Sequence, residues 1–305
     1  MNSTLHLDAA TSLSGRRAMN TLFEMVAVGG DEENRISAME AAWEEIERVE
    51  VLLSRFDPAA EVARLNREAP VRPVLMDLEM TAILALCRDF FQRTGGHFDI
   101  TAVSQAARTM DENSEREAPL RIDFENRLLQ FSHPHIFLDF GAFGKGYALD
   151  RAAGVLQRFD VRNYLIHGGT SSVLAAGRGV AGQAWRIGLR DSRADDAMVA
   201  LEQIELRNEA LSSSGAFGPN QKTSDIIHAP DRNPLLAPGA CSVIATTAVE
   251  AEIFSTAFLS MGKRATGLYL RQSQAASLRV AWINETGGRG RLEWLQSPEP
   301  SVARA

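Results

Sequence analysis

Hydrophobic periodicity divides the chain into short strands and a few long helices. Residues 21–28 alternate as a strand does and stop at Gly29-Gly30. A long helix is predicted next, because apolar residues then recur at steps of three or four: Ile36, Met39, Trp43, Ile46, Val49, Leu53 and Phe56. The glutamates between them indicate a solvated helix face rather than a metal site.

The middle of the chain predicts a second helix and a hairpin. The apolar face of this helix is formed by Leu78, Ile83, Leu84, Cys87, Phe90 and Phe91. Gly95-Gly96 is its stop signal. Residues 120–131 (LRIDFENRLLQF) predict a hairpin, and residues 135–140 (HIFLDF) predict another strand.

The second half alternates short strands with two helices. One predicted helix follows the glycine loop at 141–146, and the other covers residues 249–262. Strands are predicted for NYLIH, SSVLAAG, WRIGLR, MVALEQIEL, EALSSSG, CSVIATT, SLRVAWI and RLEWL. A loop is expected at about 216–240. Because strands outnumber helices and often follow one another, the chain predicts an α+β fold with mixed, largely antiparallel sheets and packed helices.

Composition narrows the class of protein. The 305 residues are 45% hydrophobic and 23% charged, as in an ordinary globular chain. The net charge of −7 argues against broad nucleic-acid binding. The two cysteines, Cys87 and Cys241, exclude a disulfide scaffold and predict buried thiols. With no signal-peptide core and no spanning apolar run, we expect a cytoplasmic protein without a membrane partner.

Four short motifs carry candidate chemistry, and each has a purely structural alternative. The glycine loop GAFGKG with Lys145 either cradles a phosphate or forms a turn. His167 before Gly168-Gly169 is a base or a structural histidine. Asp99 in GGHFDIT binds ribose hydroxyls or caps the next helix. Glu252 and Thr256, four apart on one helix face, either bind Mg²⁺ through oxygen or stay solvated.

Together these motifs resemble the ApbE family of FAD:protein FMN transferases, in order, over about residues 18–275. Met19-Asn20-Thr21 is similar to that family's Met-Gly-Thr, and the segment 53–66 to its S-x-Y/F…L-N pattern. The other similar segments are GGHFDIT, DFGAFGKGYALD, IHGGT, LSSSGAFG and AEIFST. One such match is weak evidence, but seven in the same order are specific.

The resemblance implies a fold, a reaction and a set of site residues. The fold would be ApbE-like and T-fold-related, with a disordered tail at 1–17, an FAD-binding catalytic domain at 18–285 in one or two subdomains around a cleft, and a terminal strand and tail at 286–305. The reaction is Mg²⁺-dependent transfer of FMN from FAD to a Thr or Ser hydroxyl of a flavin-acceptor protein, with release of AMP.

The implied FAD contacts are Met19, Phe56, His97, Phe98, Asp99, Asp139, Lys145 and Ile226. For His97, which stands where the family has a small or apolar residue, only the backbone is expected to make that contact. The implied metal ligands are Ala142, Glu252 and Thr256.

Three positions depart from the family pattern. Glu252 replaces a metal-binding aspartate and is one methylene longer. Asp225 stands where the family has its catalytic histidine, although His228 follows three residues later. Thr170 replaces an Asp or Asn. Asp225, His228 and Lys145 are therefore the predicted catalytic residues, with Asp225 or His228 as base. Two alternatives remain: an FAD-binding homologue without transfer, or an FAD pyrophosphate hydrolase that yields FMN and AMP.

Overall fold

A nine-stranded sheet is the centre of the fold. The computed structural model describes residues 5–8, 10–104, 119–190, 200–215, 226–235, 239–272, 277–286 and 289–296. The sheet has the order β1-β2-β3-β7-β8-β11-β14-β15-β16, and each pairing described within it is antiparallel. Its strands are β1 Leu5–Asp8, β2 Thr11–Ala18, β3 Thr21–Val28, β7 Tyr164–Gly168, β8 Ser172–Ala176, β11 Glu209–Gly215, β14 Ala240–Ala245, β15 Arg279–Thr286 and β16 Arg289–Gln296.

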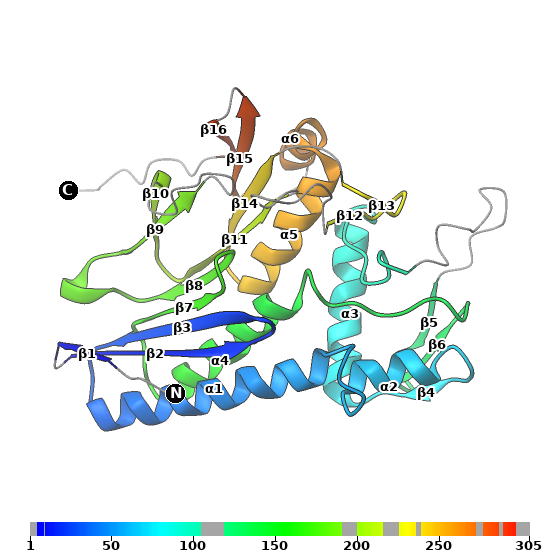
Figure 1. Ribbon diagram of the computed structural model, residues 1–305, viewed down its shortest axis with the longest axis horizontal. Helices are drawn as coiled ribbons and strands as arrows, with labels where there is room; N and C mark the ends of the chain where they lie inside the picture. The colour runs from blue at the N-terminus through cyan, green and yellow to red at the C-terminus, as the bar shows by residue number, and fades with distance from the viewer. Residues whose placement is uncertain are drawn as a thin grey trace.

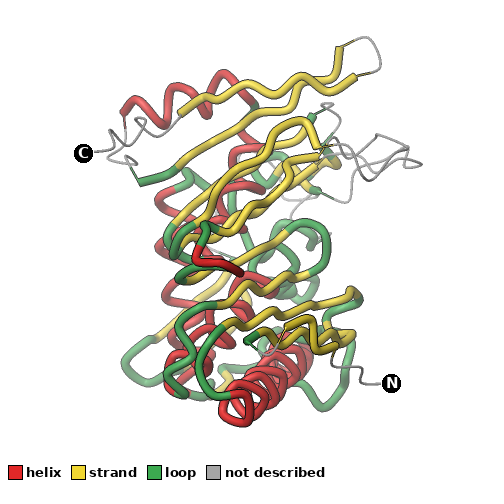
Figure 2. Tube along the Cα trace, turned by 90° about the vertical axis from the view of Figure 1, so that its left-hand side faces the viewer, coloured by secondary structure: helices red, strands yellow, loops and turns green. Residues whose placement is uncertain are grey.

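Helices pack against one face of this sheet (Figures 1 and 2). They are α1 Glu32–Leu53, α4 Gly144–Arg158, α5 Ala248–Met261 and α6 Lys263–Gln272. The other two helices, α2 Glu61–Glu68 and α3 Leu78–Arg93, lie to one side of the sheet (Figure 1). Alternation along the strands separates two cores. Ile166 joins the core shared with the helices. Its neighbour Leu165 joins a smaller core on the other face, with the hairpin of β9 Trp185–Arg190 and β10 Ala200–Leu206.

Two small sheets and one short helix complete the described chain. β4 Val74–Leu75, β6 Leu128–Phe131 and β5 Leu120–Asp123 pair in that order beside α2 and α3 (Figure 1). β12 Ile227–His228 pairs with β13 Asn233–Pro234 inside the segment predicted as a loop. A 3₁₀ helix covers Val180–Gly182. The predicted α+β class and its antiparallel pairing are confirmed, and the structure adds α6, which the sequence pattern missed.

The expected loose tail at 1–17 is wrong where the structure describes it. β2 pairs along its whole length with β3, from Thr11 opposite Val28 to Ala18 opposite Thr21. Its inward-facing serines are buried because they bind polar groups of α1. Arg35 Nε donates to Ser12 Oγ at 3.0 Å, and Trp43 Nε1 donates to Ser14 Oγ at 3.1 Å. A strand whose buried positions are serines shows no hydrophobic alternation.

Residues 135–140 form no strand, although their apolar pattern predicted one. Their backbone groups find partners outside any ladder. Asn66 bonds both the N–H and the carbonyl of Leu138, at 2.7 and 3.0 Å. Ser104 Oγ accepts from Phe137 N at 2.9 Å. These side-chain bonds satisfy backbone groups that would otherwise pair with a neighbouring strand. The glycine loop follows directly in the sequence.

Phe56 also departs from the expected pattern. The helix ends at Leu53, so Phe56 lies beyond the buried stripe and is 74% exposed. Both cysteines are buried as expected, and burial raises the pKa of each thiol. Among the described residues, no helix combines the length and apolar character that crossing a bilayer requires.

Candidate active site

Two adjoining cavities form a cleft where α4, α5 and the loop after α3 meet. The larger, here called the main cavity, has a volume of about 590 Å³. The smaller, the side cavity, has about 210 Å³. Both are lined by Arg55, Asp139, Gly141 and Lys145, so they are continuous. The main cavity has the size of a small-molecule site.

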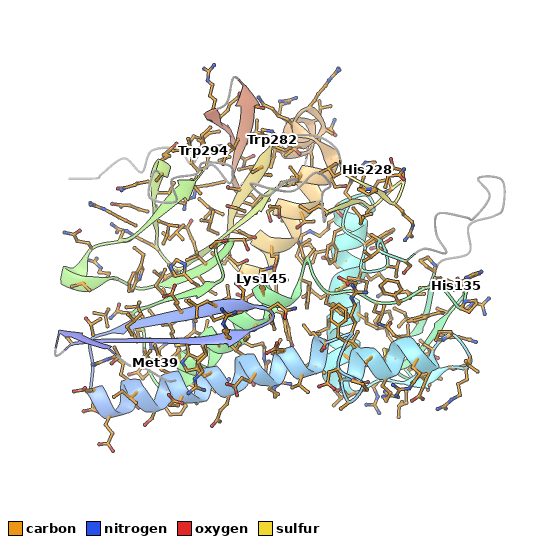
Figure 3. The ribbon with its side chains drawn as sticks, viewed as in Figure 1. Met39, His135, Lys145, His228, Trp282 and Trp294 are labelled. Carbon is orange, nitrogen blue, oxygen red and sulfur yellow. The ribbon has the colours of Figure 1, made fainter. Side chains whose placement is uncertain are left out.

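One side of the cleft is built from the first turn of α4 and the cavity-facing side of α5, here called the α4–α5 wall. Lys145 Nζ lies 2.6 Å from Glu252 Oε1. The other carboxylate oxygen accepts from the backbone N–H of Gly146. Glu252 is only 3% exposed, so its charge is stabilised by this ammonium and by the positive end of α4. Figure 3 places Lys145 near the middle of the molecule, below α5.

Close helix packing requires a glycine at this junction. A Cβ at Gly146 would lie 2.5 Å from the carbonyl oxygen of Ala248. One turn later, Asp150 accepts from the N–H groups of Ala248 and Val249 at 2.8 and 2.9 Å. Burial raises the pKa of Asp150 to about 6 against the opposing effect of these bonds. The first turns of α4 and the start of α5 are therefore held together by hydrogen bonds and close packing.

A row of hydroxyl groups continues the α4–α5 wall towards β11. Ser214 Oγ lies 2.8 Å from Ser255 Oγ and 3.0 Å from Thr256 Oγ1. Ser255 Oγ also donates to Ser212 Oγ at 3.2 Å. Ser212, Ser214 and Thr256 line the main cavity with Glu252. The wall thus presents hydroxyl oxygens beside one buried carboxylate.

A second side of the cleft, here called the loop wall, consists of residues 95–101 and 226–235. Arg232 ties these two segments together: Nη1 donates to the carbonyl of Thr101 at 2.7 Å, and Nη2 to Asp99 Oδ2 at 3.1 Å. The other oxygen of Asp99 accepts from the N–H and the hydroxyl of Thr101, both at 2.7 Å. Asp99 therefore bonds a turn and anchors Arg232. The expected helix cap is wrong in the described residues, because residues 100–103 form a turn.

Two histidines lie in contact on the loop wall. The ring centroids of His97 and His228 are 5.5 Å apart in an edge-to-face arrangement. His97 Nδ1 lies 3.0 Å from Ser260 Oγ of α5. His228 Nδ1 lies 2.9 Å from Asp231 Oδ1. Burial, and to a lesser extent the nearby His228, lower the pKa of His97.

An arginine links the entrance of the cleft to the glycine loop. Arg55 Nε lies 2.7 Å from Asp139 Oδ2, and Gly141 N donates to Asp139 Oδ1 at 2.8 Å. The guanidinium carbon of Arg55 lies 4.4 Å from the ring centroid of Phe56. The exposed Phe56 and Met19 line the side cavity. Sequence reasoning missed Arg55, although it adjoins the predicted contact Phe56.

The structure brings most of the predicted site residues to this cleft. Phe56 and Met19 line the side cavity, and Asp139 and Lys145 line both cavities. The main cavity is also lined by His97, Phe98, Asp99, Ala142, Ile226, Glu252 and Thr256. The described lining does not include His228, and Asp225 lies outside the described residues. Sequence reasoning also missed Ser260 and Arg232. Ser260 continues the four-residue spacing of Glu252 and Thr256, so that signal was available.

Gly169 supports a structural role for the histidine–glycine motif. Its φ is +69°, and a Cβ there would lie 2.6 Å from Thr21 Oγ1. Gly169 N donates to the carbonyl of Leu22 at 2.9 Å. Burial lowers the pKa of His167. The glycine is therefore needed for close contact with β3.

The oxygen donors on the α4–α5 wall suit a hard cation only in combination with a ligand. Ala142, Glu252 and Thr256 line one cavity and present carbonyl, carboxylate and hydroxyl groups. Within the described ranges, no group of three or more His, Cys, Asp or Glu side chains is arranged to hold a metal ion. The donor set therefore fits Mg²⁺ shared with phosphate and water oxygens, the usual mode for this ion.

Comparison with known proteins identifies the family of this chain. The ApbE family matches residues 19–280. FAD:protein FMN transferase from Haemophilus influenzae is 23% identical over 231 residues, covering 68% of this chain and 66% of that protein. The Treponema pallidum protein of the same name is 24% identical over 210 residues, covering 59% and 58%. These matches span less than two thirds of the relatives' own length.

Solved structures share the fold over nearly the whole chain. The flavin transferase ApbE from Vibrio cholerae has a TM-score of 0.74 at 18% identity, covering 96% of this chain and 97% of that one. The ApbE protein from Thermotoga maritima has a TM-score of 0.76 at 21% identity, with the same coverage. The family match, together with the fold and the ordered motifs around the cleft, leads to one conclusion: this chain belongs to the ApbE family.

Proposed function

We propose that this protein is an FAD:protein FMN transferase. It transfers the FMN half of FAD to a Thr or Ser hydroxyl of a flavin-acceptor protein and releases AMP. The observation that carries the proposal is the Lys145–Glu252 pair, which lies beside Ala142 and Thr256 on the wall of the main cavity. The names of the relatives from Haemophilus influenzae and Treponema pallidum support the same reaction.

In this proposal FAD occupies the cleft with its pyrophosphate against the α4–α5 wall. Lys145 provides a cation for the pyrophosphate, and the positive end of α4 adds to it. Phe56 and Met19 in the side cavity, with Phe98 and Ile226 in the main cavity, provide apolar contacts. Asp139 is held by Arg55 and would accept a hydrogen bond from the ligand.

Ala142, Glu252 and Thr256 would hold Mg²⁺ on the pyrophosphate. When bound, the ion would neutralise the charge that develops on the leaving phosphate. Lys145 and Glu252 neutralise each other, so this part of the wall carries little net charge by itself. A divalent cation and a doubly negative pyrophosphate preserve that balance, which favours joint binding of the two.

The acceptor hydroxyl must lose a proton during transfer. The predicted base was Asp225 or His228. Asp225 is outside the described residues, and His228 binds Asp231 at the edge of the loop wall. Both remain predictions.

Measuring AMP release tests the function. The protein is incubated with FAD and Mg²⁺, with or without a flavin-acceptor protein that carries the family's Thr-containing target motif. AMP together with covalent flavin fluorescence on the acceptor would support transfer. AMP and free FMN without a labelled acceptor would identify a pyrophosphate hydrolase. Bound FAD without AMP would identify an FAD-binding protein that lacks transfer.

A matched pair of variants tests the metal residues. Glu252→Ala removes the buried carboxylate and should abolish Mg²⁺-dependent turnover. Glu250→Ala, on the same helix but paired with Arg93 outside the cleft, should retain it. Unchanged turnover in Glu252→Ala would contradict the proposed metal site.

A further inference from the structure

Ser260 extends the row of site residues along α5. Glu252, Thr256 and Ser260 are spaced by four, so their side chains lie along one helix face. Four residues correspond to a rise of about 6 Å along the axis. Ser260 therefore lies one turn beyond the proposed metal ligand Thr256. Its hydroxyl is 3.0 Å from Nδ1 of His97, and this contact positions the imidazole near the end of that row.

His97 is better placed for proton transfer than His228, the described one of the two residues that the sequence suggested. It lines the main cavity together with Lys145 and Glu252. The ring of His228 packs edge-to-face against that of His97, and the Nδ1 of His228 is bound to Asp231. The described lining contains Ile226, Ile227 and Ala229 but lacks His228. Of the two histidines in contact, His97 is therefore the one that lines the cavity.

We infer that His97 is the general base of FMN transfer in this chain, held in position by Ser260. The inference rests on the proposed function. With Nδ1–H donated to Ser260 Oγ, Nε2 carries the lone pair that a base needs. A histidine at 97 thus compensates for the aspartate at 225.

The proton balance of this step is simple. The acceptor oxygen forms a bond to the phosphorus on the riboflavin side of FAD, and its proton moves to His97 Nε2. The bridging P–O bond breaks, and its electron pair leaves on the phosphate of AMP. His97 then releases the proton to solvent. The products are FMN-protein, AMP and one proton.

The surroundings keep His97 unprotonated before the reaction. Burial and the neighbouring His228 lower its pKa, so it is neutral at pH 7. Among the described residues, the charged groups named on the two walls are paired. Asp231 contacts His228, Arg232 contacts Asp99, and Lys145 contacts Glu252 across the cavity. Because the base must be neutral, the rate should fall as pH falls through the pKa of His97.

The test compares His97→Gln with wild type in the AMP-release assay with acceptor protein. We expect the rate of transfer to fall about 10²–10⁴-fold while the Kd for FAD changes little. The decline of rate at acid pH, measured from about pH 5 to about pH 9, should disappear with the imidazole. Added imidazole should partly restore the rate of His97→Ala. A merely structural role would give neither result.

Control variants separate the possible outcomes. His135→Gln changes an exposed histidine beside the small sheet, away from Lys145 and His228 in Figure 3, and should behave as wild type. Ser260→Ala should lower the rate but keep the acid decline, because the imidazole remains. FAD fluorescence quenching reports folding of each variant.

Two different failures are distinguishable. If wild type releases no AMP in the presence of acceptor, the proposed function fails and the inference fails with it. If wild type is active but His97→Gln keeps both its rate and its acid decline, only the inference is overturned. Loss of the acid decline in His228→Gln, with His97→Gln unaffected, would likewise overturn it and identify His228 as the base.

Discussion

The two sides of the cleft are fastened in different ways. On the α4–α5 wall, core helices contact each other directly, and Glu252 is bonded by both Lys145 and Gly146. On the loop wall, residues 95–101 and 226–235 are joined by a few side-chain contacts, above all those of Arg232. The first wall cannot change without disturbing the core. The second can accept new residues as long as its local contacts persist.

This difference explains where the chain departs from its family. On the α4–α5 wall, the departure is conservative: Glu252 keeps the carboxylate and adds one methylene. On the loop wall, His97 stands where the family pattern has a small or apolar residue, and His228 follows three positions after the aspartate that replaces the family's histidine in the sequence. A base must only reach the acceptor hydroxyl, so more than one position on a loop can provide it. A metal ligand has to fit the geometry of the ion as well.

The largest expected effect follows from removing one member of the buried ion pair. Lys145→Met leaves the Glu252 carboxylate, only 3% exposed, without its ammonium partner. The free energy of unfolding should fall by about 3 kcal/mol, as expected for a broken buried pair. Urea unfolding measures this change. Lys263→Met, which removes an exposed pair with Glu293, should cost less than about 1 kcal/mol.

A double variant checks the reason for that loss. Lys145→Met combined with Glu252→Leu removes both charges and should recover much of the stability, because no buried charge stays unpaired. A double variant as unstable as Lys145→Met alone would show that the loss comes from packing.

Asp150 provides a pH test of the same wall. Its pKa is raised by burial from 3.8 to about 6, so the folded protein binds the proton more tightly than the unfolded chain. Its contribution to the free energy of unfolding should therefore be greatest below about pH 4 and fall by about 3 kcal/mol as pH rises to about 6. Asp150→Asn should lack this decrease. The measurement is the difference in unfolding free energy between the two proteins at each pH. A difference that stays constant from about pH 4 to about pH 7 would contradict the prediction.

Sequence reasoning succeeded where hydrophobic periodicity and glycine spacing reflect packing. The hairpin around Glu125-Asn126, the presence of α4 and the antiparallel sheet were predicted correctly. The start of α4 was not, because the helix begins at Gly144, inside the expected glycine loop. It failed where side-chain hydrogen bonds replace those signals. The buried serines of β2 leave this strand without a hydrophobic alternation. Asn66 bonds the backbone of a segment whose apolar pattern resembles a strand.

The site residues also fall into a group that the sequence predicts and a group that it does not. The motif containing Lys145 and the pair Glu252 and Thr256 could be predicted to share a cavity, because one family's ordered motifs contain them. The hydrogen bond between Arg232 and Asp99 joins residues 133 positions apart in the sequence, and no regular spacing of residues predicts it. Such contacts depend on how loops meet in space, which local patterns do not encode.

The smallest effect on stability, and the most informative contrast, is expected at Arg232. Arg232→Met removes the bonds to Thr101 and Asp99 that join the two segments of the loop wall. Since Asp99 keeps its bonds to Thr101, the free energy of unfolding should fall by only about 1–2 kcal/mol. The proposed transfer should nevertheless slow more than ten-fold, because the segment that contains His228 is no longer joined to the segment that contains His97. Hydrogen exchange would show faster exchange within 226–235 and unchanged protection of α5. Arg162→Met, which removes only an exposed pair with Asp160, is the control and should leave transfer unchanged. If Arg232→Met lowered the free energy of unfolding as much as Lys145→Met does, the contrast between the two walls would be wrong. The loop wall would then unfold together with the α4–α5 wall, and its residues could not be exchanged independently of the proposed metal site.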